Sequence, residues 1–134
     1  MAARARVLIA DDHPGFVKAL GRVLAGECDV VGVVSDGSEV ADAAARLHPV
    51  VTVADVHLPT ISGLDACREI VQTNPRAKVI LMTATIDDAL RSEAVTAGAF
   101  GFFSKLRAAN EMLDAIRDAW AQCTRLAAPL PLDE

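Results

Sequence analysis

Five polar residues of complementary chemical type each follow an apolar run of the chain. They are Asp11, Asp12, Asp55, Thr83 and Lys105. If the ends of these runs meet, three carboxylates, a hydroxyl and an ammonium group share one shallow site. Carboxylates about 4 Å apart repel by roughly 4 kcal/mol per pair at an effective dielectric near 20, unless a cation lies among them. Magnesium suits this set best, since it prefers oxygen ligands and commonly takes one or two carboxylates with phosphate oxygens.

The chemistry expected of such a site is phosphoryl transfer to a carboxylate. We expect Asp12 and Asp55 to be direct metal ligands, while Thr83 and Lys105 hold oxygens of an incoming phosphoryl group. The product would be an aspartyl phosphate. Taken singly, the acids fit solvated residues near a helix start, Lys105 a surface lysine and Thr83 a strand residue. Their combination at the ends of four strands favours the functional interpretation.

Short β-rich runs alternate with stretches of helical periodicity, and these elements must position the polar residues. The predicted strands are Arg6–Ala10, Val30–Val34, Val50–Ala54, Val79–Met82 and Gly98–Phe103. Apolar residues at helical spacing predict a helix after each strand, the last reaching about Cys123. Helix starts are indicated by Pro14 and by the capping-box pairs Asp36 with Glu39 and Thr85 with Asp88. Five β-α units result.

Strands that read as nearly unbroken apolar runs are typical of a parallel sheet covered on both faces. With right-handed crossovers the prediction is a three-layer, doubly wound α/β domain with five strands in the flavodoxin-like order 2-1-3-4-5. That order places strands one, three, four and five side by side. The functional site is then expected outside their carboxyl ends, where the polar residues fall.

Length and composition favour one soluble domain. The chain has 134 residues, 52% of them hydrophobic, and we expect a domain over residues 1–125 followed by a tail or the start of a linker over 126–134. A net charge of −5 gives no general attraction to nucleic acid. The first apolar run stops at Asp11, far short of a membrane span, so a cytoplasmic location without membrane contact is expected. Cys28, Cys67 and Cys123 lack metal-ligand spacing and are interpreted as reduced core residues.

Four motifs resemble bacterial two-component response-regulator receivers, over about Arg6–Cys123. They are Val7-Leu-Ile-Ala-Asp-Asp12, Asp55-Val-His-Leu-Pro59 with Gly63-Leu-Asp65, Leu81-Met-Thr-Ala84, and Gly101-Phe-Phe-Ser-Lys105. The resemblance implies that Asp55 is the phosphoacceptor, Asp12 a direct Mg²⁺ ligand, and Asp11 a ligand through water. The backbone carbonyl of His57 would be a further ligand, and Thr83 and Lys105 would bind the phosphoryl group.

The resemblance also implies a switch. Thr83 would move toward the phosphoryl group while Phe102 turns inward, which changes the surface formed by the fourth helix, fifth strand and fifth helix. His57, Ala84 and Thr85 occupy the places linked in this family to the lifetime of the acyl phosphate, although an exposed histidine is as readily a solvated residue. Three departures from the family pattern, Val50, Phe102 and Leu106-Arg107, leave the core chemistry intact but imply altered partner specificity.

Two runs, Val30–Gly37 and Ala97–Lys105, resemble receivers attached to LuxR-type helix-turn-helix domains. The expected partners are therefore a histidine kinase or phosphotransfer protein, and a second copy of the chain upon phosphorylation. DNA would be bound only through an output domain that this chain does not include, in transcription regulation. The chain would be a stand-alone or excised receiver, not an enzyme beyond its own phosphorylation and dephosphorylation.

Two rival functions remain open at this point. A phosphatase of the haloacid-dehalogenase type also combines acids, threonine, lysine and magnesium, but it carries a second acid two residues after the first-strand nucleophile, where this chain has His13 and Pro14. A pseudo-receiver that only binds partners is the other rival. The presence of Asp12, Asp55, Thr83 and Lys105 counts against it, although a complete site can be silent.

Overall fold

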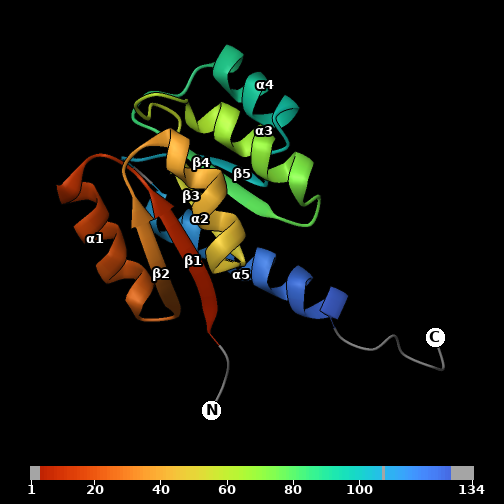
Figure 1. Ribbon diagram of the computed structural model, residues 1–134. Coiled ribbons are helices and arrows are strands. Elements are labelled where there is room, and N and C mark those ends of the chain that lie inside the picture. Colours follow the sequence, from red (N-terminus) through yellow and green to blue (C-terminus); the bar gives the residue numbers. More distant parts are fainter. Residues whose placement is uncertain (1–3, 107, 128–134) are drawn as a thin grey trace.

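The computed structural model describes residues 4–106 and 108–127, which form five parallel strands and their connecting helices (Figure 1). The strands are β1 (Ala5–Ala10), β2 (Cys28–Val34), β3 (Val51–Asp55), β4 (Lys78–Thr83) and β5 (Gly101–Ser104). The helices are α1 (Pro14–Ala25), α2 (Val40–Leu47), α3 (Gly63–Thr73), α4 (Asp88–Thr96) and α5 (Ala108–Ala127), with a short 3₁₀ helix η1 (Gly37–Glu39) before α2.

The sheet has the strand order β2-β1-β3-β4-β5, and every neighbouring pair is parallel. This confirms the predicted flavodoxin-like topology. Helices cover both faces: α1 and α5 pack on one, whereas α2, α3 and α4 pack on the other (Figure 1). Successive residues of a strand point to opposite faces, so Ile9 joins the core beneath α1 and α5 while Ala10 joins the core beneath α2 and α3.

The start of β5 was predicted three residues too early. Ala97 is the C-cap of α4, and Gly98 then adopts a positive φ of 88°, a conformation that glycine accepts readily and that turns the chain back toward the sheet. Phe100 donates its backbone N–H to Val79 O at 2.7 Å, and regular pairing with β4 begins only at Gly101. The α5 helix continues to Ala127, beyond the predicted end near Cys123.

The predicted helix caps are partly correct. Pro14 occupies the start of α1 as expected. Asp36 does cap a helix, but that helix is η1, and its carboxylate accepts from the backbone N–H of Ser38. The pairing of Thr85 with Asp88 was wrong, because Asp87 is the N-cap of α4 and accepts from the backbone N–H of Leu90 at 2.7 Å.

Cys28 and Cys67 are free and buried, as expected. The side chain of Cys123, Arg107 and the tail over residues 128–134 lie outside the described residues. Within the ranges described, no helix combines the length and the apolar character needed to cross a membrane.

Candidate functional site

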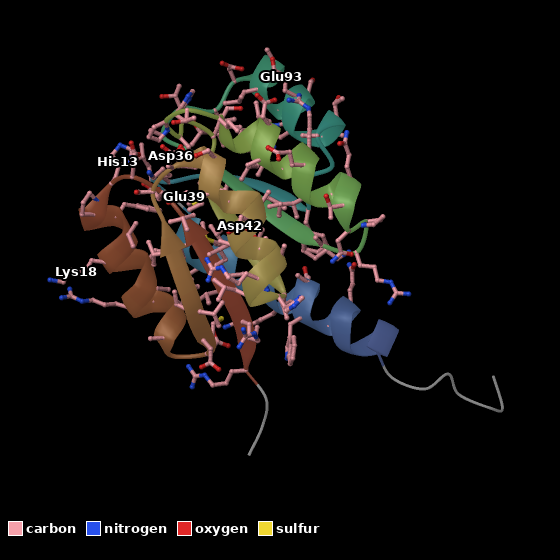
Figure 2. The ribbon with its side chains drawn as sticks, in the orientation of Figure 1. His13, Lys18, Asp36, Glu39, Asp42 and Glu93 are labelled. Atoms are coloured by element: carbon pink, nitrogen blue, oxygen red, sulfur yellow. The ribbon has the colours of Figure 1, made fainter. Side chains whose placement is uncertain are left out.

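The predicted site residues lie at the carboxyl ends of four adjacent strands. Asp11 and Asp12 follow β1, Asp55 is the last residue of β3, Thr83 is the last of β4, and Lys105 follows β5. Because the strands are parallel, these ends meet at one edge of the sheet. In Figure 2 the labelled His13, which continues the loop after β1, lies at this end of the molecule.

Lys105 joins two of the acids directly. Its Nζ donates to Asp11 Oδ2 at 2.7 Å and to Asp55 Oδ2 at 3.0 Å. Both aspartates are 2% exposed, and the ammonium group lies 4.3 Å from the centre of the Phe16 ring. Burial disfavours the charged form of Lys105, but hydrogen bonds to Asp11 and Asp55 and their charges outweigh it, so the pKa of Lys105 is raised.

The acids form a cluster suited to a divalent cation. One ligand atom from each of Asp11, Asp12, His13 and Asp55 lies within 4.8 Å of the others. Three carboxylates face the single ammonium of Lys105, so negative charge remains for a cation to neutralise. Carboxylate oxygens are the ligands preferred by hard ions such as Mg²⁺. Asp12 is exposed, which leaves one edge of the cluster open to solvent.

His13 belongs to the cluster, and sequence reasoning missed it. Its backbone N–H donates to Asp11 Oδ1 at 2.8 Å, and its Nδ1 lies 2.8 Å from the same oxygen. The ring nitrogen is also 3.2 Å from Asp12 Oδ1 and 3.2 Å from Lys105 Nζ. Its position directly after the acid pair was the available signal. His13 therefore helps to fix the orientation of Asp11.

His57 contributes to the site through its backbone. Its N–H donates to Asp55 Oδ1 at 2.9 Å, while the side chain is exposed. With Lys105 on Oδ2, both oxygens of Asp55 therefore have a hydrogen-bond donor. This arrangement fixes the carboxylate plane at the end of β3.

Neither predicted switch residue, Thr83 or Phe102, forms a hydrogen bond with the acids among those found in the described residues. Thr83 is buried, and its hydroxyl donates to Thr85 O at 3.1 Å within its own loop. Phe102 is half-buried, with the Arg91 guanidinium 5.5 Å from its ring centre. Ala84 and Thr85 are exposed on the loop after β4. The acids and Lys105 thus lie close together, whereas the Thr83 hydroxyl is hydrogen bonded to the Thr85 carbonyl.

Comparison with known proteins agrees with this geometry. Residues 7–117 match the family model described as the response regulator receiver domain. Two similar sequences are the response regulator GacA of Pseudomonas protegens, 36% identical over 118 residues and 87% of this chain, and the transcriptional regulatory protein LiaR of Bacillus subtilis, 35% identical over 116 residues and 85% of this chain. The chain spans about half of these relatives, 55% of each.

A solved structure extends the likeness to three dimensions. The two-component response regulator of the LuxR family from Aurantimonas sp. superposes with a TM-score of 0.83 at 28% identity, covering 90% of this chain and 87% of that one. The match in sequence, strand order and site position leads to one conclusion. The chain belongs to the response regulator receiver domain family, related to regulators of transcription.

Proposed function

We propose that this receiver domain takes a phosphoryl group onto Asp55 from a histidine kinase or phosphotransfer protein, with Mg²⁺ as its cofactor. The observation that carries the proposal is the position of Asp55, buried at the end of β3 and hydrogen bonded by Lys105 at 3.0 Å within the acidic cluster. A buried carboxylate next to a cation and further acids is a common arrangement for phosphoryl transfer.

The transfer step uses a carboxylate oxygen of Asp55 as the nucleophile. The oxygen forms a bond to phosphorus while the bond from phosphorus to the imidazole nitrogen of the donor histidine breaks, and the released imidazole takes up a proton. The product is an acyl phosphate on Asp55. Lys105 is within reach of this oxygen and would move from the carboxylate toward the new phosphoryl oxygens.

Asp11, Asp12 and Asp55, with the backbone carbonyl of His57, are the groups that would hold the metal. Bound there, Mg²⁺ would neutralise negative charge on the phosphoryl group and on the carboxylates. Lys105 adds one positive charge, and His13 holds Asp11 in place. The exposed residues His57, Ala84 and Thr85, on the loops after β3 and β4, would modulate how fast water removes the phosphoryl group.

The output of the reaction would be a change of surface. Thr83 would exchange its bond to Thr85 for one to the phosphoryl group, and Phe102 would turn inward, so that the α4-β5-α5 surface favours a second copy of the chain. A DNA-binding output domain of the LuxR type would then act on transcription. On this proposal the domain catalyses only its own phosphorylation and dephosphorylation.

The test is intact mass after incubation with acetyl phosphate and Mg²⁺. A single, labile phosphate adduct is expected on the wild-type protein, and none on Asp55→Asn or in excess chelator. If no adduct forms under any condition, the domain is a pseudo-receiver that signals through binding alone. Turnover of small phosphate esters would instead indicate a phosphatase.

A further inference from the structure

Two turns at the site end of the sheet are joined by polar contacts that the transfer chemistry does not use. One turn contains Asp36 and Gly37 after β2, and the other is the loop over residues 56–62 after β3. The Thr60 hydroxyl donates to Asp36 Oδ2 at 2.9 Å, and the Gly37 N–H donates to Pro59 O at 3.0 Å. Because β2 and β3 lie on either side of β1, these contacts connect the loops that flank the acid pair.

The Asp36 carboxylate is fully engaged in this connection. Its Oδ1 accepts from the N–H of Ser38 at 2.9 Å and from the Ser38 hydroxyl at 2.7 Å, while Oδ2 accepts from Thr60. The hydrogen bonds from Ser38, and then from Thr60, hold the pKa of Asp36 below its usual value. Asp36 is therefore a charged acceptor fixed between the two turns, and Figure 2 labels it at the same end of the molecule as His13.

The backbone on both sides is held in positions that few residues tolerate. Thr60 has a φ of 71°, and a β-branched residue is rarely found in this left-handed region. Such strain persists where surrounding contacts over-determine the conformation, and it gathers near functional sites. On the other side, a Cβ on Gly37 would lie 1.6 Å from Ile61 O, so the two backbones touch. A glycine at position 60 would relieve the strain but would lack the hydroxyl that reaches Asp36.

The joined loop is the one that carries His57. Its ends are fixed to the sheet and to α3, because Val56 donates its N–H to Met82 O at 2.8 Å and Gly63 donates to Val56 O at 2.9 Å. Between these anchors, the residues from Pro59 to Ile61 contact the Asp36 turn. His57 lies between the Val56 anchor and the segment held by the Asp36 turn, and its N–H donates to Asp55 Oδ1.

We propose that Asp36 and Thr60 form a clamp that positions the His57 carbonyl and the Asp55 carboxylate for the metal. Both are positioning residues, since neither contacts the acidic cluster. This inference rests on the proposed function, because it names a determinant of metal affinity at the same site. It adds a role for the turn after β2, which none of the phosphoryl-transfer groups occupies.

The test is a calorimetric titration of Mg²⁺ into the full chain after removal of metals by chelation. Thr60→Val keeps the branched shape but lacks the hydroxyl, and Asp36→Ala lacks the acceptor. Each is expected to raise the Kd for Mg²⁺ about three- to tenfold, the usual range for one net hydrogen bond. The double variant should be no weaker than the weaker single variant, because both changes break the same contact. Thr60→Ser restores the hydroxyl and should bind Mg²⁺ within about twofold of the wild type.

Two further variants separate positioning from stability. Ser38→Ala removes a hydrogen bond from the same Asp36 carboxylate without touching the loop after β3, so it should leave the Kd for Mg²⁺ unchanged. Thr60→Gly relieves the positive φ, so its thermal unfolding midpoint should not fall below that of Thr60→Val, yet its affinity for Mg²⁺ should fall equally. Affinity that simply follows the unfolding midpoint across the series would overturn the clamp.

The clamp and the proposed function fail in different ways. If the wild type binds Mg²⁺ and gains a phosphate on Asp55, while Thr60→Val and Asp36→Ala bind Mg²⁺ as tightly, the clamp is wrong and the function stands. If the wild type neither binds Mg²⁺ nor gains a phosphate, the proposed function is overturned, and the clamp is overturned with it.

Discussion

At the scale of single residues, Lys105 balances the charge of the acidic cluster. Its ammonium group is hydrogen bonded to Asp11 and Asp55, whose side chains are almost fully buried. Removing one partner of a buried ion pair leaves an uncompensated charge, which costs more than the pair contributes. The same ammonium competes with any cation that enters the cluster. Lys105 thus acts in opposite directions on metal-free stability and on metal affinity.

We therefore expect Lys105→Met to lower the free energy of unfolding of the metal-free protein by about 3 kcal/mol. The affinity for Mg²⁺ should rise, because no protein cation competes for the carboxylates. Urea denaturation in chelator and calorimetric titration with Mg²⁺ measure the two quantities. Changes of the same sign in stability and affinity would show that Lys105 does not balance the charge of the cluster.

Asp12→Asn should have the reverse pair of effects. Asp12 is exposed and adds a third negative charge beside Asp11 and Asp55. Replacing it by a neutral isostere relieves repulsion, so the metal-free protein should gain about 1 kcal/mol of stability. The Kd for Mg²⁺ should rise at least about tenfold, since a charged ligand is lost. Equal stability of variant and wild type in chelator would argue that the acids do not repel one another measurably.

The acids and Lys105 could be placed from the sequence because strand order alone decides which carboxyl ends meet. The contact of His13 with Asp11 and the turn of the Thr83 hydroxyl toward Thr85 O could not, because both depend on local loop geometry. Hydrophobic periodicity carries no information on such rotamers. Asp36 was predicted only as a helix cap, and its bond to Thr60, 24 positions along the chain, had no local signal.

At the scale of elements, α4 is the least firmly packed of the helices. Ala94 is its one buried residue, whereas Val95 is 73% exposed and Leu106, after β5, is 82% exposed. Exposed apolar side chains mark a contact surface where they form a contiguous patch. Arg91, also in α4, lies over the ring of Phe102 in β5. If a second copy binds the α4-β5-α5 surface as proposed, Val95 is an exposed apolar residue that can test this.

Val95→Asp is expected to prevent the proposed phosphorylation-dependent dimerisation while leaving the proposed phosphate uptake by Asp55 unchanged. A buried charge at the contact is costly, but the substitution lies outside the acidic cluster. Sedimentation velocity with and without acetyl phosphate and Mg²⁺ gives the assembly state, and intact mass gives the uptake. Val33→Asp is a matched control, since Val33 is 51% exposed on the edge strand β2. Loss of dimers in the control, and their retention in Val95→Asp, would assign the contact to β2 instead.

The boundaries of elements were less predictable than their order. The run from Gly98 to Phe103 reads as one strand, yet the positive φ of Gly98 makes its first part a turn. Both Thr85 and Asp87 are suitable cap residues, and only the bond to the Leu90 N–H distinguishes them. Hydrophobic periodicity identifies where a helix or strand exists, whereas the exact first residue is decided by a single hydrogen bond or dihedral angle.

At the scale of the whole molecule, a separate hydrophobic core lies on each face of the sheet. Continuous apolar strands predicted this arrangement, since a strand buried on both faces needs helices above and below it. The core beneath α2, α3 and α4 includes Cys67, which is fully buried and whose thiol lies 3.5 Å from Ala97 O. Burial disfavours the thiolate and raises the pKa of Cys67 from 9.0 to about 11. This residue reports on the integrity of the whole fold.

The raised pKa of Cys67 predicts a loss of stability at alkaline pH. Between pH 9 and about 11 the unfolded chain releases the thiol proton while the folded chain retains it. The unfolded state then binds fewer protons, so the free energy of unfolding falls as pH rises, by about 3 kcal/mol once both states are ionised. The chain has no tyrosine whose ionisation would add to this loss of stability at alkaline pH. Urea denaturation at several pH values measures the slope.

Cys67→Ala separates the effect of the Cys67 thiol from those of Lys105 and Cys28. The raised pKa of Lys105 stabilises the fold at lower pH, and this contribution is also lost as pH rises through that pKa. Burial likewise raises the pKa of the Cys28 thiol. The wild type therefore contains the losses from Cys67, Cys28 and Lys105, whereas Cys67→Ala retains only those of Cys28 and Lys105. The variant is less stable at neutral pH because it leaves a small cavity, so slopes and not absolute values are compared. A variant slope as steep as that of the wild type would mean that the Cys67 thiol ionises alike in the folded and unfolded chains.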